Sequence, residues 1–106
     1  MDKGFLIVWC TCPDDHTANT ISKHLVDQQL AACVTQLAGA RSVYRWKGKI
    51  ETAEEVVLMI KTRASAYKEL EAAVEALHPY ELPELIATRI EAGVPDYLGW
   101  VFESVK

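Results

Sequence analysis

The order in which strand-like and helix-like patterns follow one another constrains this chain more than any other feature. Apolar, extended segments of strand length cover residues 4–11, 32–37, 42–46, 50–62 and 84–90. The second and third of these segments form one strand that is kinked or bulged at Gly39. Helical spacing of apolar residues appears at about 15–29 and again after Ser65. The predicted order is therefore strand, helix, strand, strand, helix, strand.

Capping and stopping residues delimit the predicted helices. Asp14 and Ser65 are expected to cap the first and second helices, and Pro79 is expected to stop the second. The apolar face of the first helix consists of Ala18, Ile21 and Leu25, and that of the second consists of Tyr67, Leu70, Val74 and Leu77. Asp96 is expected to cap a short C-terminal helix, which carries Leu98, Val101, Phe102 and Val105.

This element order is that of an α+β, ferredoxin-like βαββαβ sandwich. Two right-handed crossovers would place both helices on one face of a four-stranded antiparallel sheet. The second and third strands would form an extended hairpin, and the C-terminal helix would follow the last strand. Because the chain has 106 residues, half of them apolar, we expect one domain over residues 1–106 with one core.

The predicted hairpin turns at Lys47-Gly48-Lys49 and has two different sides. One side is predicted to hold Arg41, Val43, Arg45, Lys47 and Lys49, and the other to hold Ser42, Tyr44, Trp46 and Ile50. Glu51 and Glu55 are expected to pair with Arg45 and Arg41. The aromatic side needs a cover, which is either another copy of the chain or the chain's own C-terminal helix.

Charge and composition bear on partners and compartment. Eleven basic against fifteen acidic residues give a net charge of −4, which argues against a nucleic-acid partner. The longest apolar stretches are far shorter than the roughly 20 residues that cross a bilayer, so no membrane segment is expected. Three cysteines are too few for a disulfide framework, and they favour a reducing cytoplasm.

Short motifs along about ninety residues resemble the CutA family of divalent-cation tolerance proteins. The matching residues are Cys10-Thr11, Pro13-Asp14, LAACV at 30–34, SVYRWKG at 42–48, Glu55, Lys61-Thr62, His78-Pro79-Tyr80, Pro83-Glu84, Tyr97 and Trp100. The resemblance implies a ferredoxin-like subunit and a homotrimer assembled through the hairpin. It also implies a cytoplasmic location and the binding of copper or other divalent metal ions.

Cys10 and His78 match the metal ligands proposed for that family. One form of the family pattern has two histidines before Pro-Tyr, and here Leu77 stands in place of the first. Cys12 lies two residues beyond Cys10, on the same strand face, and is a candidate second sulfur ligand. The alternative reading makes the cysteines small buried side chains and has His78 cap the carbonyls of its helix.

The architecture of the family also resembles that of the PII signalling trimers, which bind ligands between subunits. Trp46, Lys61, Tyr80 and Glu84 match family positions suited to line such a ligand cleft. Their alternative roles are hairpin packing for the aromatic residues and an interfacial ion pair between Lys61 and Glu84. A stable trimeric adaptor is a third reading. The sequence offers no recognisable catalytic constellation, so we expect a protein that is not an enzyme.

Overall fold

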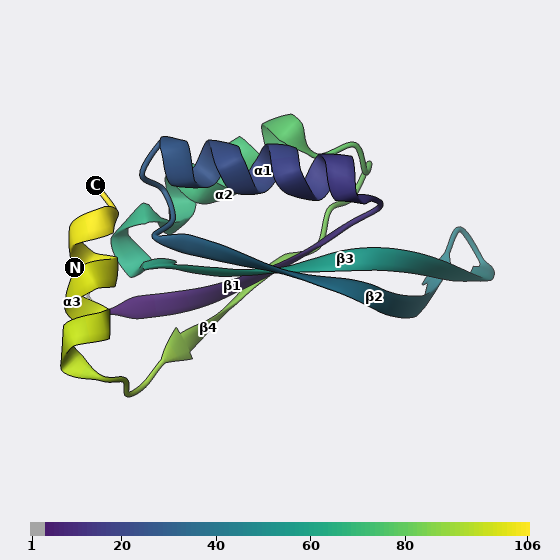
Figure 1. The fold of residues 1–106 in the computed structure, drawn as a ribbon. Coiled ribbons are helices and arrows are strands. Elements are labelled where there is room, and N and C mark those ends of the chain that lie inside the picture. The colour runs from purple at the N-terminus through teal and green to yellow at the C-terminus, as the bar shows by residue number, and fades with distance from the viewer. Residues whose placement is uncertain (1–3) are drawn as a thin grey trace.

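The computed structural model describes residues 4–106. Its elements are β1 (Phe5–Cys12), α1 (Asp15–Asp27), β2 (Cys33–Trp46), β3 (Lys49–Arg63), the 3-10 turn η1 (Ala64–Ala66), α2 (Tyr67–Leu77), β4 (Leu85–Ile90) and α3 (Pro95–Ser104). The strands form one antiparallel sheet in the order β2-β3-β1-β4. Helices α1 and α2 cover one face of this sheet, and α3 lies at its end (Figure 1). The predicted α+β, ferredoxin-like βαββαβ sandwich is confirmed.

The core lies between the sheet and its two covering helices. Alternate residues of β1 and β3 point toward these helices, because side chains alternate across a strand. The fully buried side chains include Val8, Cys10 and Cys12 of β1, Leu58 and Ile60 of β3, Ile21 and Leu25 of α1, and Leu70 and Val74 of α2. Among the residues that the structure describes, no helix covers the opposite face of the sheet along most of its length (Figure 1).

The helix starts agree with the prediction in one case of three. The Asp14 carboxylate accepts a 2.8 Å hydrogen bond from the Thr17 amide, so the predicted cap of α1 is confirmed. The chain enters α2 through η1, and its N-cap is Ala66 with no side-chain bond, so the cap predicted at Ser65 is wrong. The cap predicted at Asp96 is also wrong. Pro95 takes the first helical position, where its missing N–H leaves nothing unpaired, and Asp96 lies in the first turn.

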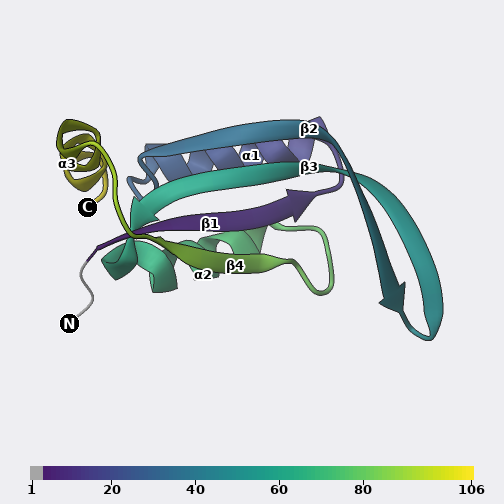
Figure 2. The same cartoon turned by 90° about the horizontal axis from the view of Figure 1, so that it is seen from below.

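The hairpin of β2 and β3 is closed by a two-residue turn. Lys47 and Gly48 have φ values of 51° and 81°, and two successive positive φ values are those of a type I′ turn. A register shift between Leu37 and Ala40 surrounds Gly39, whose φ is 81°, so the predicted bulge is confirmed. Beyond this shift the hairpin bends away from the rest of the sheet (Figure 2).

The two-residue turn gives the hairpin a different register from the predicted one. Arg45 lies opposite Ile50, and Arg41 lies opposite Glu54, with which it forms an exposed 4.0 Å ion pair. The predicted pairing of these arginines with Glu51 and Glu55 is wrong. Ile50 therefore shares the side of Arg41, Val43 and Arg45, whereas Lys49 and Glu51 share the side of Trp46 and Tyr44.

Helix α3 packs far from the hairpin tip. Its buried residues Val101 and Val105 contact Ala32, Ala66 and Phe5 at the opposite end of the sheet (Figure 1). The alternative in which the C-terminal helix covers Tyr44 and Trp46 is therefore wrong. Within residues 4–106, no helix combines the length and the apolar character that a membrane span requires.

Candidate metal cluster and the adjoining cleft

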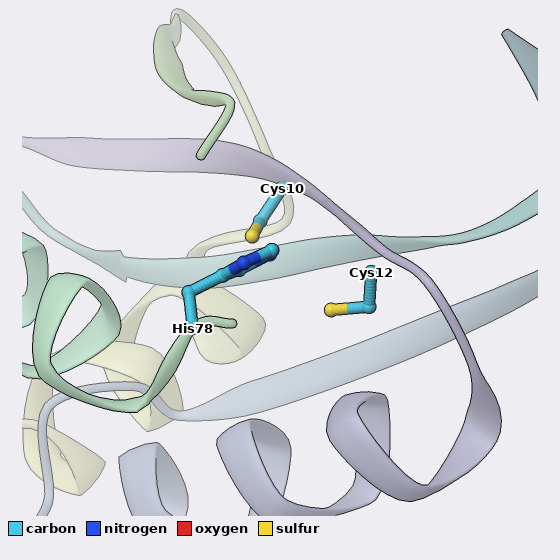
Figure 3. Close-up of side chains that lie close together, drawn as sticks. All are labelled: Cys10, Cys12 and His78. Atoms are coloured by element: carbon cyan, nitrogen blue, oxygen red, sulfur yellow. The ribbon is translucent and has the colours of Figure 1, made fainter. Parts of the chain in front are cut away.

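Two cysteines and one histidine meet beneath the helices at the end of β1. The ligand atoms of Cys10, Cys12 and His78 all lie within 4.8 Å of one another, and all three residues are buried. The His78 side chain reaches from the end of α2 toward the two thiols of β1 (Figure 3). The structure thus brings together the two predicted ligands and the candidate second sulfur.

Local backbone preferences place each of these side chains. Cys10 and Cys12 are two residues apart on a strand, so both thiols point toward the helices. His78 precedes Pro79, and a residue before proline avoids helical geometry. The φ and ψ of His78 are −80° and 135°, which end α2 and turn the imidazole over β1. Leu77, which stands where one form of the family pattern has a histidine, lies within α2 and is 36% exposed.

Both ring nitrogens of His78 are engaged in hydrogen bonds. The Tyr80 amide donates to Nδ1 over 3.1 Å, and Nε2 lies 2.7 Å from the carbonyl oxygen of Thr11. An amide N–H only donates and a carbonyl only accepts, so Nε2 carries the proton and Nδ1 holds the lone pair. The ring therefore does not cap the carbonyls of α2, and that alternative reading of His78 is wrong.

The two thiols are coupled to one another. A hydrogen bond with Cys12, together with burial, raises the pKa of Cys10 above its ordinary value. The same hydrogen bond lowers the pKa of Cys12, so the first thiolate of the pair forms on Cys12. The Cys10 thiol also lies 3.8 Å from the Thr11 carbonyl oxygen.

The donor atoms of this cluster determine which metal ions it suits. Two sulfur donors and an imidazole favour soft or borderline cations such as copper and zinc, whereas magnesium and calcium prefer oxygen ligands. The cluster offers three donors, two of which must lose a proton on binding. The lone pair on Nδ1 of His78 becomes available only when the Tyr80 amide is released. These residues fit a soft cation.

A cleft of about 720 Å³ lies on the other side of the end of β1. It is bounded by the hairpin, by Thr11 and by the segment 79–84 that leads into β4. Its lining residues are Thr11, Ser42, Val43, Tyr44, Arg45, Trp46, Glu55, Pro79, Tyr80, Glu81, Leu82 and Glu84. Thr11 stands between Cys10 and Cys12 in sequence, so strand alternation directs it away from the cluster.

Three of the four predicted cleft residues meet there. Trp46, Tyr80 and Glu84 line the cleft, whereas Lys61 lies in the middle of the sheet. The Lys61 ammonium donates to Thr35 Oγ1 over 3.0 Å and lies 3.6 Å from the sulfur of Cys33. Over residues 4–106 of a single chain, Lys61 and Glu84 do not form the suggested ion pair.

Glu55 is a cleft residue that the sequence did not identify. The residue is 7% exposed, and its carboxylate accepts a 2.7 Å hydrogen bond from the Tyr80 hydroxyl. Burial and this bond raise the pKa of Tyr80. Glu55 is among the residues that match the CutA family, but the match gives it no role. The hairpin pattern predicted an ion pair between Glu55 and Arg41. The available signal was the turn, because a two-residue turn at Lys47 and Gly48 makes Ala40 the partner of Glu55.

Comparisons with known proteins agree along most of the chain. The sequence pattern of the family described as "CutA1 divalent ion tolerance protein" matches residues 6–104. The "Divalent-cation tolerance protein CutA" of Thermus thermophilus is 42% identical, over 92% of this chain and 95% of that protein. The "Protein CutA homolog" of Xenopus laevis is 47% identical over 92% of this chain, which spans 64% of the length of that relative.

Solved structures show the same similarity. The crystal structure of CutA from Xylella fastidiosa matches with a TM-score of 0.94 and 48% identity, covering 96% of this chain and 98% of that one. The structure described as the periplasmic divalent cation tolerance protein CutA of Archaeoglobus fulgidus matches with a TM-score of 0.93 and 35% identity, over 96% and 99% of the two chains.

Proposed function

Since this chain belongs to the CutA1 divalent ion tolerance family, we propose that it binds copper or another divalent metal ion through Cys10 and His78. The observation that carries the proposal is the buried meeting of three nitrogen and sulfur donors within 4.8 Å. Cys12 is the third donor in this proposal. The chain's role is then to bind ions rather than to catalyse a reaction.

The residues around the cluster would control how the ion is held. The helices exclude water from the two thiols, which strengthens the attraction between a thiolate and a cation. The Thr11 carbonyl and the Tyr80 amide hold the His78 ring at its two nitrogens, so the ring must give up one of these bonds to bind the ion. These bonds compete with the ion for the ring nitrogens, and this competition lowers the affinity.

The direct test is a competitive chelator titration of Cu(I) and Cu(II). We expect Cys10→Ser and His78→Ala each to weaken binding tenfold or more, a loss of roughly 1.4 kcal/mol. Cys33→Ser is the matched control, because Cys33 is the remaining cysteine and lies on β2 outside the cluster. Weak binding, or binding indifferent to both cluster substitutions, would refute the metal site.

We also propose that the chain forms a homotrimer through its hairpin. Large apolar side chains stay exposed in the single chain, with Val43 66%, Ile50 69% and Ile86 58% exposed. Exposed apolar surface of this kind favours association. Sedimentation of the wild type at micromolar concentration is expected to give the trimer mass, and Val43→Asp is expected to shift it toward the monomer. A wild type that sediments only as monomer would contradict the proposal.

The proposed location is the cytoplasm. Its support is chemical, because all three cysteines are free thiols and two belong to the proposed cation site. An oxidising compartment would place these thiols at risk of disulfide formation or oxidation. Fractionation of cells that express the native protein is the measurement that tests this location.

A second candidate function is ligand sensing by a trimer that resembles the PII proteins. The cleft favours it, because about 720 Å³ accommodates a small molecule and Trp46, Tyr80 and Glu84 line it. Lys61 would complete such a site only from a neighbouring subunit. A thermal-shift screen with metabolites tests this function, and a broad screen without hits would leave the metal function or a trimeric adaptor.

A further inference from the structure

The cleft beside the metal cluster is acidic. Of its described lining residues, Glu55, Glu81 and Glu84 carry carboxylates, whereas Arg45 is the single basic one. Arg45 is exposed and lies on the hairpin side opposite to that of Tyr44 and Trp46. An anionic ligand would meet three like charges there, so the lining favours a positively charged one.

Glu55 is the least solvated of these carboxylates. It is 7% exposed, and its hydrogen-bond partner is the neutral hydroxyl of Tyr80. Within residues 4–106, no basic nitrogen forms an ion pair with it. A buried carboxylate without a cation is destabilising, and a ligand cation placed beside it would relieve that penalty.

The aromatic walls suit an organic cation. Tyr44, Trp46 and Tyr80 line the cleft, and the face of an aromatic ring attracts an ammonium group. The protein already places one such group at the rim. The Lys47 ammonium lies 5.8 Å from the centroid of the Trp46 ring and 3.9 Å from the Glu81 carboxylate. Because Lys47 and Glu81 are largely exposed, this pair is weak and can be displaced.

A bare metal ion fits this cleft less well than an amine. Metal ions of the hard class need several oxygen ligands that converge on one point. Among the described residues, the one group of His, Cys, Asp or Glu side chains close enough to hold an ion is the cysteine–histidine cluster. The three cleft carboxylates form no such group, whereas a diamine can reach separated carboxylates with its two ends.

We propose that the cleft binds a small protonated aliphatic amine, whose ammonium group pairs with Glu55 between the rings of Tyr44, Trp46 and Tyr80. A second ammonium group on a diamine would reach Glu84 or Glu81. The inference rests on the second candidate function, because it names the ligand class for the same cleft. It does not require the metal cluster to be filled.

Calorimetric titration with three probes of similar length tests the ligand class. Diaminobutane is a dication, butanediol is its neutral counterpart, and succinate is a dianion. We expect diaminobutane to bind at least tenfold more tightly than butanediol, and succinate not to bind. The affinity for diaminobutane should fall as salt is raised, because ions screen the attraction between charges.

Charge-removing variants then locate the site. Glu55→Gln keeps an acceptor for the Tyr80 hydroxyl and removes the charge, so we expect it to weaken diaminobutane binding at least tenfold. Glu54→Gln is the matched control, because it removes the same charge from the neighbouring position, which is 83% exposed. It should change the affinity less than twofold. Trp46→Leu is a second variant that weakens binding without altering a buried charge.

Each outcome decides the matter. Equal affinities of Glu55→Gln and Glu54→Gln would overturn the proposed site. Preferential binding of succinate would overturn the amine class while leaving a ligand cleft, completed by Lys61 of a neighbouring copy. If none of the three probes binds, the amine inference fails, and the metabolite screen then decides separately whether the cleft function survives. The copper titration is independent of all these results.

Discussion

The backbone amide of Tyr80 donates to Nδ1 of His78 over 3.1 Å, while the hydroxyl of the same tyrosine donates to Glu55 over 2.7 Å. One residue therefore contacts the cysteine–histidine cluster with its main chain and the acidic cleft with its side chain. The imidazole and the phenol ring also lie with centroids 4.7 Å apart. The two candidate sites share this residue as a wall.

The tautomer of His78 is the first prediction. In the metal-free protein, long-range nitrogen NMR should show the proton of this ring on Nε2 and the lone pair on Nδ1, because of the Tyr80 and Thr11 bonds. A soft cation added in stoichiometric amount should shift the amide resonance of Tyr80. His16 and His24 on α1 serve as internal controls. A ring protonated on Nδ1 would contradict the prediction.

Copper affinity should rise with pH. The raised pKa of Cys10 keeps this thiol protonated through neutral pH and beyond the ordinary cysteine value of 9.0. Binding must expel that proton, so each proton released adds about tenfold in affinity for every pH unit. Chelator competition between pH 6 and pH 9, an interval of about three units, measures the slope. Cys10→Ser should lower the slope by about one proton, and an unchanged slope would refute this role.

Tyr80→Phe should destabilise the fold by about 1–3 kcal/mol, because it leaves the Glu55 carboxylate without its hydroxyl partner. Denaturant unfolding at one protein concentration measures this. Tyr97→Phe is the control and should change stability by less than about 0.5 kcal/mol, since its hydroxyl lies 4.0 Å from Cys33 and the residue is 43% exposed.

The same tyrosine predicts an alkaline loss of stability. Burial raises the pKa of Tyr80 above 10.0, so the unfolded chain releases this proton before the folded chain does. The contribution is complete below pH 10 and is lost as the pH rises above that value. Tyr80→Phe should lack this part of the loss. A wild type and a variant with identical alkaline profiles would contradict the assignment.

Replacing each of two glycines with alanine should change the stability of the fold in opposite directions. Gly48 has a φ of 81° in the hairpin turn, and an L-residue there is strained by about 1–2 kcal/mol, so Gly48→Ala should destabilise. Gly99 lies within α3 with open space around its Cα, so Gly99→Ala should stabilise by about 0.5–1 kcal/mol. Thermal unfolding of both variants measures the pair, and shifts of the same sign would be inconsistent with this backbone geometry.

The element order was predictable because apolar periodicity reports which faces are buried, and a βαββαβ order leaves few topologies. Helix starts were less predictable. Asp14 follows a strand directly and caps as expected, whereas Ser65 lies in a tight turn between two buried alanines that pack into the core. Capping depends on the path of the chain as well as on residue type.

The candidate sites, too, were predictable from the sequence only in part. Strand alternation predicts that Cys10 and Cys12 share a face, but only the packing of α2 on β1 brings His78 to them. For the cleft, one residue of turn length decides the register of the whole hairpin. That residue separates the observed partner of Glu55, which is Ala40, from the predicted one, Arg41.

Alternate residues of β1 serve two sites back to back, and this sets a limit on how such a chain can evolve. A single residue inserted within Phe5–Cys12, ahead of Cys10, would turn both thiols toward the cleft and carry Thr11 into the core. A point substitution can change either site separately, whereas a change of strand length exchanges the faces on which the β1 side chains of the two sites lie. Descendants of this chain can therefore change single side chains at either site but not the length of the strand that the two sites share.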